Sequence, residues 1–356
     1  MNKFKDLVKE SLNREIMKPD EARNLLLKPF IRPYSKRILG HLDWDSALRF
    51  PPIIQVENTN LCNTNCIMCP RDEMRRKKGV IDISVFRKII DDVVNGFGQT
   101  PGSVTLGGFG EPLADRNFVE EVKYCKAKGL KVETFTNASL LDPSVSNEIV
   151  GKVDVLYVSL DSVSEKTYKT VRPKLDFRQV EDNIMYLLEL KKEQKADLPK
   201  VVVGTHELKE VREEIPLFIR KWKGLADEVT VSTVHEWSLK KGWLEGVGFS
   251  TPQAKRRAPC MRLWNFLNVL WTGEVNICCS DFDGSEIIGD AGKSNVLEIW
   301  QGERYRELRE IHLKREFYRV DICAECNQWK YAPDVQPWWW DNYLRLNQDV
   351  EYPRKK

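Results

Sequence analysis

Nine cysteines are the residues of this sequence with the most obvious chemistry, and eight of them fall into two groups. Cys62, Cys66 and Cys69 form a tight group with the spacing C-x3-C-x2-C. A sparser group, with Cys279 adjoining, consists of Cys260, Cys278, Cys323 and Cys326. Nine cysteines in 356 residues are too few for a disulfide scaffold, so the grouped thiols indicate metal binding in a reducing compartment.

The first group would suit a reactive iron–sulfur cluster. Three thiolates on one loop can hold three corners of a cubane and leave its fourth iron without a protein ligand. An open coordination position is what chemistry at a metal requires. Spacing alone leaves two other interpretations open, a zinc site with a distant fourth ligand and three incidental thiols. The second group, which ends in the C-x2-C pair Cys323 and Cys326, would suit zinc or a fully ligated iron–sulfur cluster equally.

Short apolar runs alternate with amphipathic stretches between the two groups. We expect strands at residues 53–56, 103–106, 131–135, 155–159, 201–203 and 229–232, with helical spacing in residues 84–94, 117–128, 177–192 and 209–222. Repeated strand–helix units force parallel strands with right-handed crossovers. The alternation therefore predicts an α/β fold, either a doubly wound sheet or a partial barrel. Cys125 falls on the apolar face of its helix, which predicts a packing role.

Polar motifs follow the predicted strands. They are Gly107, Gly108, Gly110, Glu111 and Pro112 after the second strand, Asn137 after the third, Ser159 and Asp161 after the fourth, His206 after the fifth, and His235 with Glu236 after the sixth. Because ligands of such folds bind at the carboxyl ends of the strands, we expect one shared ligand site there. The glycines could instead form a tight turn, Ser159 and Asp161 could cap helices, and the histidines could be satisfied polar groups.

The cysteine loop and the glycine motif resemble those of the radical S-adenosylmethionine (SAM) superfamily. The resemblance implies a partial (β/α)6 TIM-like barrel in which Cys62, Cys66 and Cys69 hold a [4Fe-4S] cluster that binds SAM and cleaves it reductively to a 5′-deoxyadenosyl radical. It also implies that the motif from Gly107 to Pro112 holds the methionyl amine. Asn137, Ser159 and Arg172 become SAM-binding candidates, and a surface salt bridge is the other interpretation of Arg172. Met68 stands where the family often has an aromatic residue near the adenine.

The second group resembles the abbreviated SPASM or "twitch" domain, a small α+β iron–sulfur domain. The resemblance implies that Cys260, Cys278, Cys323 and Cys326 bind one auxiliary [4Fe-4S] cluster, since no cysteine follows Cys326. Cys279 would then be a spare thiol beside the cluster. It could return a hydrogen atom to a carbon radical, as an epimerase requires, or it could be a small buried hydrophobe.

Four regions follow from these patterns. We expect a helical extension at residues 1–48, the radical SAM core at 49–240, the auxiliary domain at 255–335 and a tail at 336–356, whose tryptophans at 338–340 either pin the tail or stack on a substrate. A net charge of +3 is too small to create the positive electrostatic field that binding a nucleic acid requires, so we expect no nucleic-acid partner. The absence of a signal-like or membrane-spanning apolar run predicts a cytoplasmic protein.

The resemblance implies a dehydrogenase or epimerase that abstracts a hydrogen atom from a carbohydrate or aminocyclitol-like substrate. The cysteine pattern is similar to that of aminocyclitol dehydrogenases, in which a nearby cluster can complete a two-electron oxidation. Such an enzyme would need a low-potential electron donor such as flavodoxin or ferredoxin. The alternatives are a maturase of a ribosomally made peptide and a non-catalytic iron–sulfur or zinc scaffold protein.

Overall fold

The computed structural model describes residues 50–97, 103–232 and 259–331, together with the single residues 234, 248 and 257. The predicted N-terminal extension, the C-terminal tail with its tryptophans at 338–340, and His235 with Glu236 lie outside the described residues. So does most of the segment between the two predicted domains.

Six parallel strands form the first part of a mixed sheet. They are β1 (Ile53–Val56), β2 (Ser103–Leu106), β3 (Lys131–Thr136), β4 (Val155–Ser159), β5 (Lys200–His206) and β6 (Glu228–Ser232), and they pair in chain order. All six lie where the apolar runs predicted strands. β5 extends three residues beyond its predicted end because its last residues, Thr205 and His206, are polar but still pair with β6.

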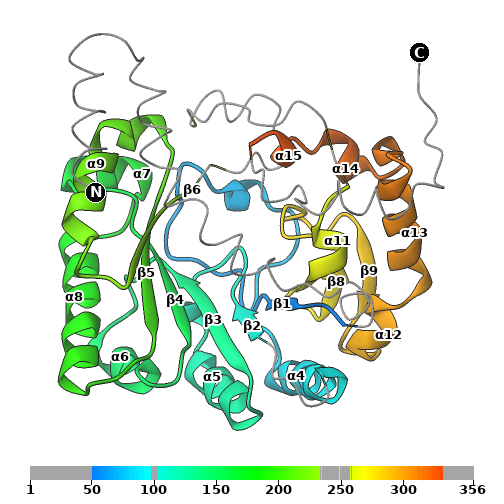
Figure 1. The fold of residues 1–356 in the computed structure, drawn as a ribbon, viewed down its shortest axis with the longest axis horizontal. Coiled ribbons are helices and arrows are strands. Elements are labelled where there is room, and N and C mark those ends of the chain that lie inside the picture. The colour runs from blue at the N-terminus through cyan, green and yellow to red at the C-terminus, as the bar shows by residue number, and fades with distance from the viewer. Residues whose placement is uncertain are drawn as a thin grey trace, which may run out of the picture.

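Helices cover one face of these strands. Alternate strand residues such as Val132, Leu156 and Val201 are fully buried and belong to the core that the helices complete. Figure 1 shows the helices α4, α5, α6 and α8 along the outer side of the strands. The helices of this part are α4 (Ile83–Phe97), α5 (Phe118–Ala127), α6 (Pro143–Ile149), α7 (Glu165–Val171), α8 (Phe177–Glu193) and α9 (Ile215–Trp222).

Three short 3-10 helices accompany them: η1 (Pro70–Glu73), η2 (Pro112–Ala114) and η3 (Lys209–Glu214). The stretch predicted as one helix over residues 209–222 begins as η3 and becomes α-helical only at Ile215, where Pro216 occupies the first turn. Cys125 is fully buried in α5, which confirms its predicted packing role.

The C-terminal part continues the same sheet. β7 (Phe266–Val269) pairs in parallel with β1, and β8 (Glu274–Asn276) and β9 (Ile287–Asp290) follow in antiparallel order. The described strands therefore form one sheet in the order β6-β5-β4-β3-β2-β1-β7-β8-β9. This architecture is the predicted partial barrel with a small C-terminal α+β unit.

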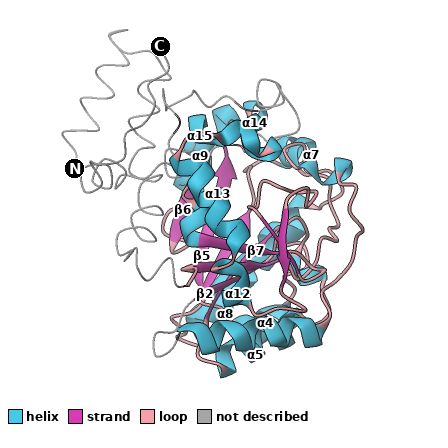
Figure 2. Cartoon of the chain, turned by 90° about the vertical axis from the view of Figure 1, so that its right-hand side faces the viewer, coloured by secondary structure: helices cyan, strands magenta, loops and turns pink. Residues whose placement is uncertain are grey.

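Short helices complete this unit. They are α11 (Arg262–Asn265), α12 (Val296–Trp300), α13 (Glu303–Leu313), η4 (Phe317–Arg319), α14 (Asp321–Glu325) and α15 (Gln328–Tyr331), and Figure 2 shows α12 and α13 on the side of the molecule that carries β7. One apolar core runs through both parts, from Phe50 and Ile54 to Trp300 and Tyr305. Among the described helices, none combines the length and the apolar character that crossing a membrane requires.

Candidate active site

The three-cysteine loop lies at the carboxyl end of β1, and hydrogen bonds hold its central residues. The buried Arg71 guanidinium donates from Nη2 to the Thr64 carbonyl (2.8 Å) and to Oδ1 of Asn65 (3.0 Å). Farther along the loop, the Ile67 amide donates to the Val171 carbonyl at the end of α7 (3.1 Å). The loop is therefore positioned by its own chain and by the fourth strand–helix unit.

The three thiols lie close enough to influence one another. Burial raises the pKa of the Cys69 thiol to about 12, and the neighbouring Cys66 and Cys62 thiols act in the same direction. Burial also raises the pKa of Cys62. Iron has to displace these protons, so loading of the loop is coupled to their release. Within the described part of the chain, no three His, Cys, Asp or Glu side chains are grouped so as to hold a single metal ion.

The glycine motif after β2 packs directly on the cysteine loop. The Glu111 amide donates to the Leu61 carbonyl (2.8 Å). A Cβ atom on Gly110 would lie 2.3 Å from the Thr59 carbonyl oxygen and 2.6 Å from that of Leu61, so only glycine permits this approach. The predicted ligand motif and the predicted cluster loop are therefore brought together.

Glu111 and Asn137 link the ends of β2 and β3. The buried Glu111 carboxylate accepts from Thr136 Oγ1 and from the Asn137 amide, each at 2.7 Å. Burial raises the pKa of Glu111 despite these bonds. The Asn137 side chain donates to Oδ1 of Asn63 in the cysteine loop (3.0 Å). Both side chains thus position the loops, and their binding of SAM stays a prediction.

Arg172 is buried and paired, which excludes the surface salt bridge considered for it. Its Nε and Nη2 each lie 2.7 Å from Oδ2 of Asp161, and its Nη1 donates to the Cys66 sulfur at 3.3 Å. The other Asp161 oxygen accepts from the His206 amide (2.9 Å) and contacts its Nδ1 (2.8 Å). Asp161 is therefore no helix cap, and His206 is a satisfied polar group.

The contacts of Asp161 with Arg172 and His206 stabilise its negative charge. Burial by itself would raise the pKa of Asp161, but Arg172 and then His206 outweigh it and hold that pKa below its ordinary value. Asp161 also has a positive φ of 69°, a conformation that turns the chain at the end of β4. Ser159, half-buried at that end and opposite Gly204 in the register, stays a SAM-binding prediction.

The four cysteines of the second group also come together. Burial raises the pKa of the Cys278 thiol, and the nearby thiols of Cys279, Cys323 and Cys260 raise it further. Burial raises the pKa of Cys260 to about 11, with a contribution from Cys326. These thiols come from the segment before α11, the end of β8 and the region of α14. Four thiols that influence one another in this way are the donor type that a fully ligated iron–sulfur cluster requires.

Two residues beside this group were not predicted. His312 in α13 accepts from the Cys260 amide through Nδ1 (3.1 Å), and its Nε2 faces the Cys323 sulfur at 3.4 Å. Burial lowers the pKa of His312 to about 3, so the neutral ring carries its proton on Nε2, toward the sulfur. Arg262 in α11 donates from Nη1 to the Cys279 sulfur at 2.7 Å. Neither residue belongs to a spacing pattern, so no signal in the sequence singled them out.

A buried ion pair joins the two cysteine regions. Glu57, directly after β1, receives Nη1 and Nη2 of Arg76 at 2.6 and 2.5 Å. The same guanidinium donates from Nε to the Phe282 carbonyl (2.7 Å), four residues after Cys278. The Asp283 carboxylate in turn accepts from the amides of Arg75 and Arg76. The segment after the first cysteine loop is thus attached to the loop after the second group.

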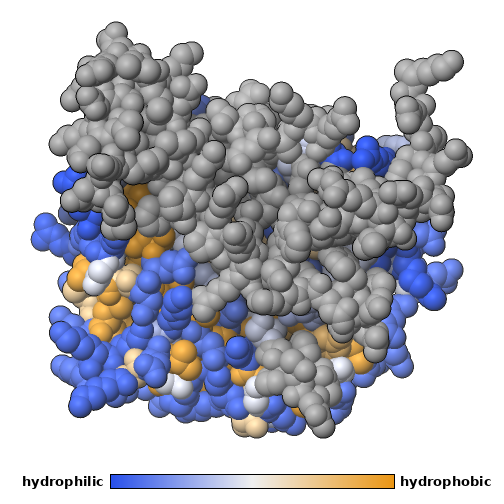
Figure 3. Space-filling model, in the orientation of Figure 1, coloured by the Kyte–Doolittle hydropathy of each residue, from blue (hydrophilic) through white to orange (hydrophobic). Residues whose placement is uncertain are grey.

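The sheet face away from the helices presents a ring pair. Phe135 on β3 and Tyr157 on β4 are opposite in the register and stack with centroids 4.5 Å apart and planes 15° apart. Phe135 is 42% exposed, whereas its neighbours Thr134 and Thr136, which point to the other face of the sheet, are buried. On the described part of the face that Figure 3 shows, hydrophobic residues form small areas among hydrophilic ones.

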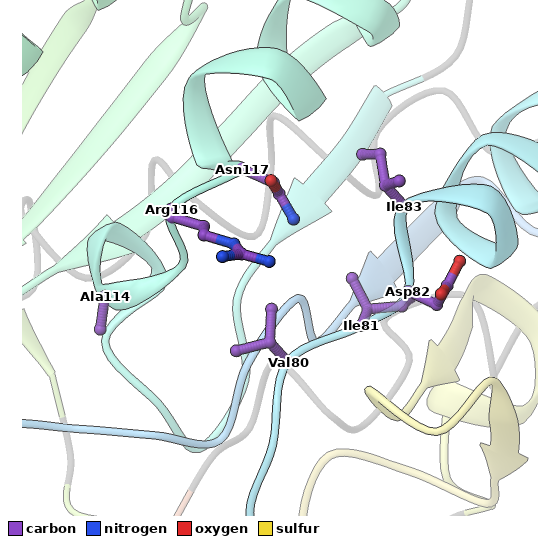
Figure 4. Close-up of a pocket in the computed structure, with 7 residues that line it drawn as sticks. All are labelled: Val80, Ile81, Asp82, Ile83, Ala114, Arg116 and Asn117. Atoms are coloured by element: carbon purple, nitrogen blue, oxygen red, sulfur yellow. The ribbon is translucent and has the colours of Figure 1, made fainter.

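A pocket of about 460 Å³ lies elsewhere, between the segments that precede α4 and α5. Figure 4 shows the side chains of Arg116 and Asn117 beside Val80 and Ile81 at this pocket. No cysteine lines it.

This fold and these two thiol sites define a radical enzyme of the iron–sulfur type. Residues 56–214 match the family model described as the radical SAM superfamily, and residues 260–327 match the SPASM model, an iron–sulfur cluster-binding domain. Together the matches span well over half of the chain. The chain therefore belongs to the radical SAM superfamily and has a C-terminal SPASM domain. These two domains imply three kinds of cofactor, namely SAM, the [4Fe-4S] cluster that binds SAM, and auxiliary iron–sulfur ligands in the form of a further cluster.

Two curated relatives differ in how much they share with the chain. The tungsten-containing aldehyde ferredoxin oxidoreductase cofactor-modifying protein of Pyrococcus furiosus is 31% identical over 109 residues, which are 30% of each chain. The S-adenosyl-L-methionine-dependent 2-deoxy-scyllo-inosamine dehydrogenase of Niallia circulans is 22% identical over 283 residues, which are 77% of this chain and 92% of the relative. The chain thus spans less than a third of the first relative and nearly all of the second.

Solved structures share the fold. BtrN in complex with AdoMet and 2-DOIA has a TM-score of 0.53 at 17% identity, covering 78% of this chain and 93% of BtrN. Streptococcus suis SuiB bound to its precursor peptide SuiA has a TM-score of 0.58 at 14% identity, covering 73% of this chain and 67% of SuiB. These likenesses support the architecture of barrel and SPASM domain.

Proposed function

We propose that the chain is a cytoplasmic radical SAM dehydrogenase that oxidises an alcohol carbon of a carbohydrate or aminocyclitol-like substrate. The observation that carries the proposal is the second site, in which Cys260, Cys278, Cys323 and Cys326 influence one another within the unit that continues the barrel sheet. A redox centre at that place can accept the second electron of an alcohol oxidation. The similarity to the Niallia circulans dehydrogenase over most of both chains supports the substrate class.

The proposed oxidation balances with SAM as the hydrogen-atom acceptor and an external donor of one electron. When bound and reduced by one electron, SAM and its cluster would supply a 5′-deoxyadenosyl radical as the acceptor for the hydrogen atom on the carbon of a secondary alcohol. The resulting hydroxyl-bearing carbon radical then loses the hydroxyl proton and one electron to become a ketone. The auxiliary site is the proposed destination of that electron. Low-potential flavodoxin or ferredoxin is the proposed source of the first one.

The chain's own residues would bind and orient the reactants. Cys62, Cys66 and Cys69 are the proposed cluster ligands, and the motif from Gly107 to Pro112 is proposed to hold the methionyl amine. Asn137 and Ser159 adjoin it at the next strand ends. Arg172 would share its charge between Asp161 and the SAM carboxylate. The stacked Phe135 and Tyr157 rings offer an apolar surface to the C–H face of a saturated ring.

The test is a product assay on the reconstituted, anaerobic chain. We expect SAM, dithionite and a panel of aminocyclitols that includes 2-deoxy-scyllo-inosamine to give 5′-deoxyadenosine and a ketone in equal amounts. Cys66→Ala should abolish both products. Cys125→Ala is the matched control, because this buried cysteine lies in α5 outside either thiol group, and it should keep both products.

The same assay in deuterated water separates the alternatives. A ketone supports the dehydrogenase, whereas an epimer with deuterium at the inverted carbon would identify an epimerase, for which Cys279 is the proposed hydrogen donor. Turnover of a peptide in place of any aminocyclitol would identify a maturase. A protein that binds its clusters but releases no 5′-deoxyadenosine with any substrate would contradict every enzymatic interpretation.

A further inference from the structure

Each thiol site has one arginine that donates to a cysteine sulfur. Arg172 reaches Cys66 in the first site at 3.3 Å, and Arg262 reaches Cys279 in the second at 2.7 Å. Hydrogen bonds to sulfur and nearby charge are among the features by which proteins set the potential of an iron–sulfur cluster. The two contacts are therefore candidates for redox tuning.

The two arginines differ in how their charge is balanced. Arg172 is neutralised by the fully buried Asp161, with Nε and Nη2 both at 2.7 Å from Oδ2. Among the residues that the structure describes, Arg262 has no ion pair with a carboxylate, and its guanidinium lies 5.2 Å from the Phe266 ring centroid. The charge of Arg172 is thus largely cancelled, whereas that of Arg262 faces the sulfurs.

The surroundings of Arg262 show which groups its charge reaches. Arg262 lies two residues after Cys260, and its Nη1 contact is with Cys279, the residue that follows Cys278. The effect of its charge reaches both members of this cysteine pair. It therefore does not depend on whether Cys278 or Cys279 binds iron.

We propose that Arg262 is a positioning residue that raises the reduction potential of the auxiliary cluster, and that Asp161 cancels the same effect of Arg172 at the SAM-binding cluster. Reduction adds one negative charge to a cluster, and an uncompensated cation nearby stabilises that charge. The inference rests on the auxiliary cluster of the proposed function. It leaves only one of the two arginines to raise a potential, since the auxiliary site should accept an electron and the SAM-binding site should donate one.

The experiment is an EPR-monitored redox titration of the reconstituted holoenzyme without substrate. We expect Arg262→Gln to lower the equilibrium constant for reduction of the auxiliary cluster at least tenfold. This corresponds to a reduction potential that is lower by about 59 mV for one electron. Arg262→Lys, which keeps the charge, should restore most of the difference. The SAM-binding cluster of the same molecules is the internal reference, and its potential should not move.

A second variant tests the other half of the inference. Asp161→Asn removes the carboxylate that neutralises Arg172, so it should raise the potential of the SAM-binding cluster and leave the auxiliary cluster unchanged. Should Arg262→Gln lose its auxiliary cluster, this variant decides alone, and an unchanged potential overturns the inference. Equal shifts of both clusters in Arg262→Gln would also overturn it, because they would indicate a general structural change.

Failure of this inference differs from failure of the proposed function. Midpoint potentials are measured without turnover, whereas the proposed function is tested by the ketone and 5′-deoxyadenosine. If the chain forms the ketone but its midpoint potentials do not change in the Arg262 variants, the proposed function stands and the inference about Arg262 is wrong. A protein whose second site binds no iron would lose both.

Discussion

A buried carboxyl pair behind the glycine motif shows how a single residue can govern the response to pH. Glu121 and Asp115 are 0% and 2% exposed, and Asn58 donates to Oε2 of Glu121 at 3.1 Å. Burial, followed by the charge of Asp115, raises the pKa of Glu121 to about 9. At neutral pH Glu121 therefore keeps its proton in the folded chain.

This pKa predicts how stability changes with pH. An unfolded glutamate has a pKa of about 4.3, so between about pH 5 and pH 9 the folded chain holds a proton that the unfolded chain releases. The contribution of Glu121 is thus fully present below the unfolded pKa and is lost as pH rises toward the folded one. Glu121→Gln mimics the protonated side chain, and we expect its free energy of unfolding to fall less steeply over this range than that of the wild type.

Urea unfolding at a series of pH values measures this difference. Glu193→Gln, at the exposed end of α8, is the control and should give a curve parallel to that of the wild type. Parallel curves for Glu121→Gln as well would mean that the folded chain ionises Glu121 like an exposed carboxyl.

Residue types and spacing predicted the cysteines of both sites, because thiolate ligands need a limited set of separations along a loop or hairpin. They did not predict His312 or Arg262. The contact from the Cys260 amide to His312 joins α13 to the segment before α11, so it exists only after the core has packed. The pairing of Arg172 with Asp161 was equally hidden, since a guanidinium suits any nearby carboxylate.

At the scale of elements, a substitution that adds one methyl group tests whether the close approach of the glycine motif to the cysteine loop is required. Gly110→Ala would place Cβ against the Thr59 and Leu61 carbonyls, which are backbone atoms and cannot move without the loop. We expect this variant to lose the N-terminal cluster and keep the auxiliary one. Iron analysis should then fall from about eight to about four atoms per chain.

Gly129→Ala is the control for this variant. Gly129 has a φ of 79°, and nothing lies within 4 Å of the added Cβ, so the change strains a turn without touching either site. It should reduce stability and leave the iron content unchanged. An equal loss of iron in both variants would show that the effect is general instability.

Strand positions followed from β-branched runs because buried parallel strands need apolar side chains on both faces. The polar end of β5 escaped that criterion, and the start of α9 depended on Pro216, whose missing amide suits a first turn. The place of β7 could not be predicted. Its pairing with β1 depends on a register between segments that are more than 200 residues apart in the sequence, which no local pattern encodes.

For the whole molecule, the Glu57–Arg76 pair is the connection to test. Arg76→Met would leave the buried Glu57 carboxylate without its cation, at a cost of about 3–5 kcal/mol in the free energy of unfolding. Adding Glu57→Gln should recover a large part of that loss. A double-mutant cycle in urea, with Glu57→Gln as the other single variant, measures the coupling energy.

The exposed pair of Arg87 and Glu120 provides the comparison, because a surface pair should couple by at most about 1 kcal/mol. Additive effects at Glu57 and Arg76 would show that the buried pair does not hold the two regions together. Strong coupling there and weak coupling at the surface pair would support the connection.

The position of β1 between β2 and β7 has a consequence for biosynthesis. During translation the first six strands leave the ribosome long before β7 exists, so β1 waits with one edge of unpaired peptide groups. Such an edge is a template for aggregation. We therefore expect the nascent barrel to depend on chaperones until its C-terminal strands have been synthesised. We also expect iron–sulfur assembly proteins to insert the clusters after translation of the chain is complete.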